Sequence, residues 1–138
     1  MQLTSISLIG YIFWYMTLTL GIAGLRGVLM LTKRRAINSF SADGKDAGDI
    51  GMRLSRAHAN CYESFPIVGG AMLLALASGL SDITDPLAPW VIAARIGQSV
   101  VHIASISPLA VNVRFLFFAA QLCIVGYWLL MMGGKFIQ

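Results

Sequence analysis

The residues best suited to chemistry lie in one short stretch, Arg53 to Pro66. At about 100° per helical residue, Arg53, Arg56, Asn60 and Glu63 fall within roughly 80° of one another and form a polar stripe. Glu63 is two turns from Arg56 and is expected to pair with it, with Asn60 between them. For Arg53 the pattern favours an interfacial anchor, whereas the convergence of Arg56, Asn60 and Glu63 predicts a ligand-binding site. The alternative for these three is an arginine that snorkels and neutralises a glutamate.

A second group of polar residues repeats this spacing further along the chain. Arg95, Gln98 and His102 are spaced i, i+3, i+7 and therefore share one helical face. Arg95 lies near the middle of its apolar segment, so its side chain is predicted to point inward, where pairing with Glu63 is one interpretation. Arg114 begins the last apolar segment and is expected level with the polar stripe.

No metal or haem centre is predicted from the histidines and cysteines. His58 points nearly opposite to the stripe, and a lone histidine such as His102 is more often a packing residue than a ligand. Cys61 and Cys123 have no metal-binding or redox spacing. A buried thiol that fills space is the favoured role for Cys61.

Composition restricts the class of protein that must position these residues. Of the 138 residues, 57% are hydrophobic and 12% are charged, whereas a soluble domain carries about 25% charged residues. The apolar residues also lie in long runs. This excludes an ordinary soluble domain, a disordered chain and, with two distant cysteines, a disulfide-rich module. The chain is predicted to be a small integral membrane protein that crosses the bilayer several times.

The apolar runs predict an all-α fold, an integral membrane four-helix bundle that forms a single domain over residues 1–138. The first run is longer than a bilayer core of about 30 Å requires and lacks a basic leader, so an uncleaved spanning helix is expected. The predicted helices cover about residues 6–31, 49–80, 87–106 and 111–132, and a polar loop covers 32–48.

The distribution of basic residues predicts the orientation. The net charge is +4, and six of the ten Lys and Arg lie between positions 33 and 56: Lys33, Arg34, Arg35, Lys45, Arg53 and Arg56. Nucleic-acid binders spread basic residues over an exposed face, whereas membrane proteins concentrate them in cytoplasmic loops. We therefore expect no nucleic-acid partner, a cytoplasmic long loop and both termini outside. The shortness of the chain mildly favours a bacterial inner membrane.

The pattern R-A-x-x-N-x-x-E-x-x-P over Arg56 to Pro66, on the second of four expected helices, resembles the MAPEG family of membrane-associated proteins in eicosanoid and glutathione metabolism. The agreement in layout covers all four helices, whereas motif-level agreement is confined to residues 53–66. The resemblance implies a homotrimer that binds glutathione, as co-substrate and without a metal, at the subunit interfaces near the cytoplasmic side.

The resemblance also implies roles for single residues. Arg56, Asn60 and Glu63 correspond to the family's glutathione ligands, and an arginine fork suits a glutathione carboxylate. His58 would contribute from the neighbouring subunit. Arg34 is the best match for a basic residue at the end of the first helix, although Lys33 and Arg35 are alternatives.

In the active enzymes of the family an arginine near the start of the fourth helix activates the thiol, and Arg114 is the candidate here. A nearby cation lowers a thiol pKa from about 8.5 toward neutrality. Gln98 and His102, which are expected to line the site, replace tyrosines found in parts of the family. Phe115 and Phe118 stand where some members have Ser and Tyr. These departures weigh more against isomerase and leukotriene-type activities than against glutathione binding.

Three functional hypotheses follow. The first is a glutathione S-transferase or peroxidase that acts on small lipophilic electrophiles entering from membrane lipid. The second is a catalytically silent family member with a binding or assembly role. The third is a small four-helix transporter with Glu63 as the coupling carboxylate, which the two nearby arginines disfavour.

Overall fold

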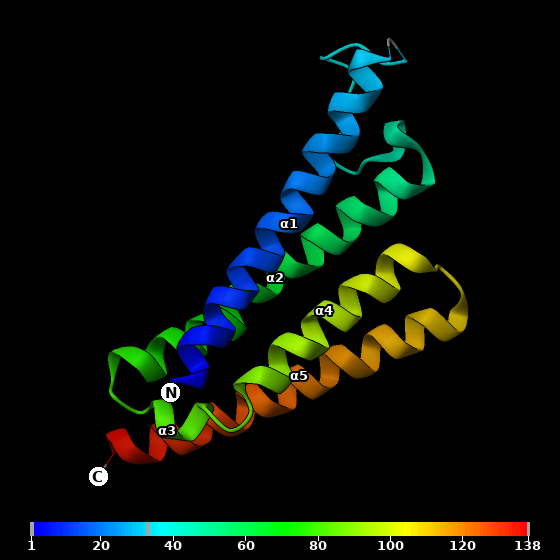
Figure 1. Ribbon diagram of the computed structural model, residues 1–138. Coiled ribbons are helices and arrows are strands. Elements are labelled where there is room, and N and C mark those ends of the chain that lie inside the picture. The colour runs from blue at the N-terminus through cyan, green and yellow to red at the C-terminus, as the bar shows by residue number, and fades with distance from the viewer. Residues whose placement is uncertain (1, 33, 138) are drawn as a thin grey trace.

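The computed structural model describes residues 2–32 and 34–137, and all regular structure in them is helical. Four helices of 17 residues or more account for most of the chain (Figure 1). They are α1 (Leu3–Leu31), α2 (Gly48–Ala77), α4 (Ala88–Ala104) and α5 (Pro108–Phe136). Two short elements join them, the 3-10 helix η1 (Lys45–Ala47) and the one-turn helix α3 (Ser81–Thr84). The described residues therefore form five α-helices, with α3 in the segment expected to be only an acidic turn.

Local capping explains where the helix ends differ from the sequence-based boundaries. Residue 108 begins α5 instead of ending a turn, because proline is favoured at a first helical position and the Ser107 hydroxyl accepts a hydrogen bond from the Ala110 N–H at 3.2 Å. At the other boundary α2 ends at Ala77, three residues early. Gly79 adopts φ +69° there, and the Leu80 N–H donates to the Ala75 carbonyl at 2.8 Å, as in a Schellman motif.

The four long helices form two hairpins that converge at one end of the molecule and separate toward the other (Figure 1). The first hairpin is α1 with α2, and the second is α4 with α5. Their apolar faces meet in one core, whose fully buried side chains include Tyr11, Met72, Val91, Trp128 and Met132. All four long helices thus contribute side chains to the same core.

Two helices, α1 and α5, are long and apolar enough to cross a membrane by length and composition. Each has 29 residues, which at 1.5 Å per residue gives about 44 Å, more than a hydrocarbon core of about 30 Å. That α2 and α4 also cross the bilayer remains a prediction.

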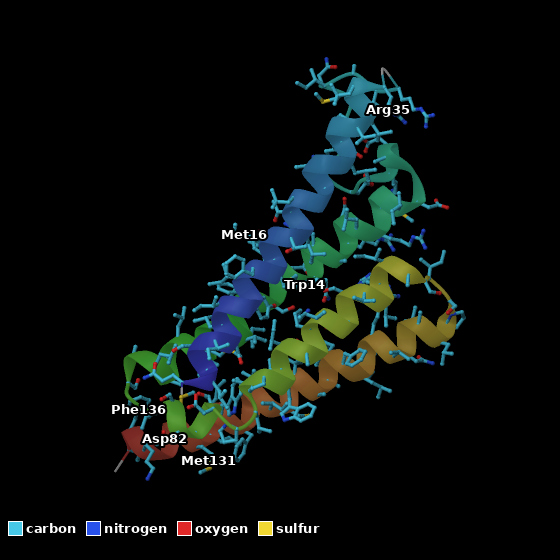
Figure 2. The ribbon with its side chains drawn as sticks, in the orientation of Figure 1. Trp14, Met16, Arg35, Asp82, Met131 and Phe136 are labelled. Carbon is cyan, nitrogen blue, oxygen red and sulfur yellow. The ribbon has the colours of Figure 1, made fainter. Side chains whose placement is uncertain are left out.

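The two ends of the bundle differ in charge. Arg35 lies beyond the end of α1, whereas Asp82 lies at the opposite end, near Met131 and Phe136 of α5 (Figure 2). At this acidic end the Thr4 hydroxyl donates to an Asp85 carboxylate oxygen at 2.6 Å and the Thr4 N–H donates to the same oxygen at 2.8 Å. These bonds attach the start of α1 to the turn after α3.

Candidate functional site

The polar stripe of α2 is largely exposed in one chain. Arg56 and Glu63 are both exposed, and Asn60 between them is half-buried. The ion pair found in the described residues joins Lys45 to Asp43 in the loop, at 3.1 Å. The pairing of Arg56 with Glu63 expected from their spacing is therefore not made within the chain.

Asn60 is held by a buried arginine of α4. Arg95 is fully buried, and its Nη1 donates to the Asn60 side-chain oxygen at 2.7 Å. The guanidinium also lies over the Tyr11 ring of α1, 5.8 Å from its centroid. The inward direction predicted for Arg95 agrees with this burial, but its partner is Asn60 and not Glu63.

The backbone of α2 is fixed at the same level by side chains from two helices. The Tyr11 hydroxyl of α1 donates to the Cys61 carbonyl at 3.0 Å, and the Ser64 hydroxyl donates to the Asn60 carbonyl. A helix carbonyl that precedes a proline by four residues loses its usual partner. The carbonyls one and two residues before that point accept from hydroxyls: the Tyr11 bond holds this turn of α2 against α1, and the Ser64 bond lies within α2.

Gln98 lies in the core between α4 and α5. Its side-chain oxygen accepts from Gln121 Nε2 at 3.1 Å, and both side chains are buried. Gln121 Nε2 donates also to the Phe117 carbonyl, at 2.8 Å. A buried amide pair of this kind stabilises helix contact. Gln98 is thus beside the proposed site but directed toward α5.

His102 is half-buried in α4, and its Nδ1 has no hydrogen-bond partner among the described residues. Arg56 of α2 is exposed, and Arg114 of α5 is half-buried. That these three residues lie at one level of the bundle stays a prediction.

His58 and Arg34 lie apart from this group within one chain. The His58 Nε2 is 3.1 Å from the Thr19 hydroxyl, and its ring stacks on Tyr15 of α1 with centroids 4.9 Å apart. Arg34 is exposed just after α1, where its backbone N–H donates to the Leu29 carbonyl. Lys33, the alternative basic residue, lies outside the described residues.

Arg53 joins two helices. Its Nη1 donates to the Ala104 carbonyl at 3.2 Å, one of the last carbonyls of α4, which lack partners within their own helix. A cation at a helix C-terminus also interacts favourably with the helix dipole. The sequence favoured an interfacial anchor for Arg53, which stays a prediction; the contact seen is a hydrogen bond between α2 and α4.

The cysteines and acidic groups do not gather as metal ligands would. Over residues 2–32 and 34–137, no three His, Cys, Asp or Glu side chains come together as a metal site requires. Cys61 is buried and Cys123 is exposed.

Sequence reasoning did not identify Tyr11 as part of this region, nor Asn60 as the partner of Arg95. Both contacts join residues 35 or more positions apart, and helical periodicity gives no information on which neighbour a face meets. The one available signal was the position of Arg95 in the middle of an apolar segment, which predicts burial with a polar partner.

Comparison with known proteins gives one match. A model of the MAPEG family matches residues 4–134, nearly the whole chain. Comparisons with curated proteins and with solved structures give no match.

Proposed function

The chain belongs to the MAPEG family, and on that premise we propose that it is a glutathione S-transferase or peroxidase of lipophilic electrophiles. Family membership, together with two helices suited to crossing a bilayer, makes it a membrane protein related to glutathione and eicosanoid metabolism. The specific reaction, the ligand and the assembly are the parts proposed here.

One observation carries the proposal: Arg56 and Glu63 are exposed on the same face of α2 without an ion-pair partner among residues 2–32 and 34–137. Ionisable side chains in a membrane protein are costly unless they are paired or face a wet cavity. Glutathione offers two carboxylates and an ammonium group, which complement an arginine and a glutamate. We propose that Arg56 binds a carboxylate and Glu63 the ammonium group.

The contact with Arg95 supports a role for Asn60 as a directed donor. Because Arg95 occupies the side-chain oxygen of Asn60, the amide NH₂ of Asn60 is left to donate outward. A peptide carbonyl of glutathione is the acceptor that this orientation suits. Arg95 would then be a positioning residue for Asn60.

A trimer of four-crossing subunits would complete the site. His58 faces α1 and Arg34 follows the end of α1, so neither approaches the stripe of its own chain. We propose that both reach the glutathione bound to a neighbouring subunit. His102 would line the inner wall, whereas Gln98, expected from the sequence to line it too, is buried against Gln121 of α5.

Arg114 is the proposed catalytic residue. The glutathione thiol would lose its proton to solvent, and the Arg114 guanidinium would stabilise the resulting thiolate. With an aromatic halide the thiolate sulfur forms a bond to the ring carbon and halide leaves with the bonding electron pair. Arg56, which is expected at the same level, would add to the positive electrostatic potential around the sulfur.

Glutathione binding to the purified protein in nonionic detergent tests the site. Calorimetric titration should show binding to the wild type and at least tenfold weaker binding to Arg56→Ala and Glu63→Ala. Arg53→Ala is the matched control, because it also removes an arginine from α2. The Arg53 side chain donates to the Ala104 carbonyl and has no role in the proposed glutathione site. Unaltered affinity in Arg56→Ala and Glu63→Ala would exclude the proposed site.

A second candidate, a silent family member, is favoured by the surroundings of Arg114. Phe115 is exposed and Phe118 half-buried beside it, where a hydroxyl could otherwise donate to the sulfur. Turnover of an aromatic halide distinguishes the two candidates. The transferase predicts turnover that falls about 10²-fold or more in Arg114→Ala with glutathione binding retained, whereas a silent member binds glutathione without turnover.

A further inference from the structure

Tyr11 of α1 is fully buried where three helices meet, and the proposed function gives it no role. Its hydroxyl donates to the Cys61 carbonyl of α2 at 3.0 Å, and its ring lies against the Phe65 ring with centroids 5.4 Å apart. The Arg95 guanidinium of α4 lies over the same tyrosine ring, 5.8 Å from its centroid. One side chain of α1 therefore contacts both α2 and α4.

The bond from the Tyr11 hydroxyl is an extra contact that α2 does not need for its own hydrogen bonding. In an α-helix the carbonyl of residue i accepts from the N–H of residue i+4, so the Cys61 carbonyl has a helical partner in Phe65. The carbonyl that loses its helical partner is that of Tyr62, because a proline follows four residues later. The Tyr11 bond therefore does not replace a missing backbone bond. It fixes α2 against α1 at the residue after Asn60.

Asn60 is held from two sides by these contacts. Its side-chain oxygen accepts from Arg95 Nη1 at 2.7 Å, and the carbonyl of the next residue, Cys61, accepts from Tyr11. The Tyr11 ring also presents its face to the Arg95 guanidinium, an arrangement that stabilises a buried cation. Tyr11 thus contacts the group that binds the Asn60 side chain and the backbone that carries Asn60.

Packing alone does not explain the hydroxyl of Tyr11. The ring lies in an apolar core with neighbours such as Leu8, Val68 and Met72, and a phenylalanine ring would occupy nearly the same volume. A buried hydroxyl adds stability only through the bond it makes, and any shift that breaks the bond leaves an unsatisfied polar group. The bond to Cys61 therefore favours one position of α2 relative to α1 over its neighbours.

We propose that Tyr11 is a positioning residue of the glutathione site, which holds Asn60 and Arg95 in the relative position from which the Asn60 amide group donates to the ligand. This inference rests on the proposed function, in which the Asn60 NH₂ donates to a peptide carbonyl of glutathione. Tyr11 does not touch the ligand, because its side chain is fully enclosed by the bundle. Its contribution to glutathione binding passes through Asn60.

Tyr11→Phe tests the proposal, since it removes the hydroxyl and keeps the ring beneath Arg95. Calorimetric titration of the full-length protein in nonionic detergent should show glutathione binding about threefold to tenfold weaker than in the wild type, the range expected for one neutral hydrogen bond. Tyr127→Phe is the matched control, because it makes the same chemical change at an exposed position of α5, and it should bind as the wild type does. Wild-type affinity in Tyr11→Phe would overturn the proposal.

A double-mutant cycle separates positioning of Asn60 from a general loosening of the core. In the Asn60→Ala background, Tyr11→Phe should cause no further loss of glutathione affinity. In the Glu63→Ala background it should cause the same loss as in the wild type. Equal losses in the two backgrounds would show that Tyr11 acts on the whole site and would also overturn the proposal.

A measurement without glutathione keeps this inference distinguishable from the proposed function. The chain has asparagines only at positions 38, 60 and 112, so NMR with ¹⁵N-labelled asparagine resolves few side-chain amides, and Asn60→Ala identifies the relevant one. The order parameter of the Asn60 amide should fall in Tyr11→Phe and not in Tyr127→Phe. An unchanged order parameter in Tyr11→Phe would overturn the inference. A wild type that binds no glutathione would overturn the proposed function, while the order parameter would still show whether Tyr11 holds Asn60.

Discussion

At the scale of single residues, the contact that most affects the site joins Arg95 to Asn60. Arg95 is fully buried without a carboxylate partner among the described residues, and its guanidinium is stabilised by the Asn60 side-chain oxygen and the face of the Tyr11 ring. A buried charge is costly, and we propose that the function of Arg95 is to orient Asn60. It holds the donor end of that amide in one direction.

We predict that Arg95→Met weakens glutathione binding about tenfold, because Asn60 is then free to rotate. The effect should not add to that of Asn60→Ala: in a double-mutant cycle measured by calorimetry, the double variant should bind no more weakly than Asn60→Ala alone. Additive losses would show that Arg95 acts independently of Asn60.

A second residue-scale prediction concerns pH. Hydrogen bonds from the Thr4 hydroxyl and N–H lower the pKa of Asp85 below its ordinary value. The carboxylate therefore contributes stability above that ordinary pKa, and this contribution is lost as the pH falls through the lower pKa of the folded state. At pH 6 the wild type should have a higher Tm than Asp85→Asn. This difference in Tm should shrink below about pH 4. A difference that stays constant down to pH 2 would contradict this assignment.

At the scale of elements, the loop after α1 packs on the start of α2 through two glycines. Gly44 adopts φ +71°, and a Cβ there would lie 2.5 Å from the Gly51 carbonyl oxygen. This close approach holds the loop against α2. The same loop is attached to α1, because the Arg26 Nη2 of α1 donates to the Ser41 carbonyl at 2.7 Å.

We predict that Gly44→Ala destabilises the protein by about 1–3 kcal/mol, from left-handed backbone strain and the collision with α2. Gly79→Ala is the matched control, since Gly79 has φ +69° but an added Cβ would meet nothing within 4 Å. Thermal unfolding should show a larger loss for Gly44→Ala than for Gly79→Ala. Equal losses would mean that the close approach contributes nothing beyond strain.

The helical class and the positions of the long helices follow from hydrophobic runs and turn residues, which act locally. Helix ends were less predictable, because Pro108 can end a turn or begin a helix and the Ser107 cap decides. The arrangement of the site residues was even less predictable than the helix ends. Periodicity placed Arg56, Asn60 and Glu63 on one face of α2, but the meeting of Asn60 with Arg95 depends on how α2 packs on α4.

At the scale of the whole molecule, the proposed site needs a neighbouring subunit, since Arg56 and Glu63 are both exposed in one chain. We predict a homotrimer: native mass spectrometry from nonionic detergent should give three times the chain mass of 14.9 kDa. Arg34→Ala and His58→Ala should weaken glutathione binding without altering that mass. A monomer that binds glutathione with full affinity would contradict the assembly.

The two cysteines differ in exposure, with Cys61 enclosed by the core and Cys123 on the outer surface of α5. The native protein thus has one accessible thiol. A maleimide fluorophore or spin label should attach once per chain, at Cys123, and report the surroundings of α5 without any engineered mutation. Comparing labels that partition into lipid with labels that stay in water would then measure how deeply that helix sits in the bilayer.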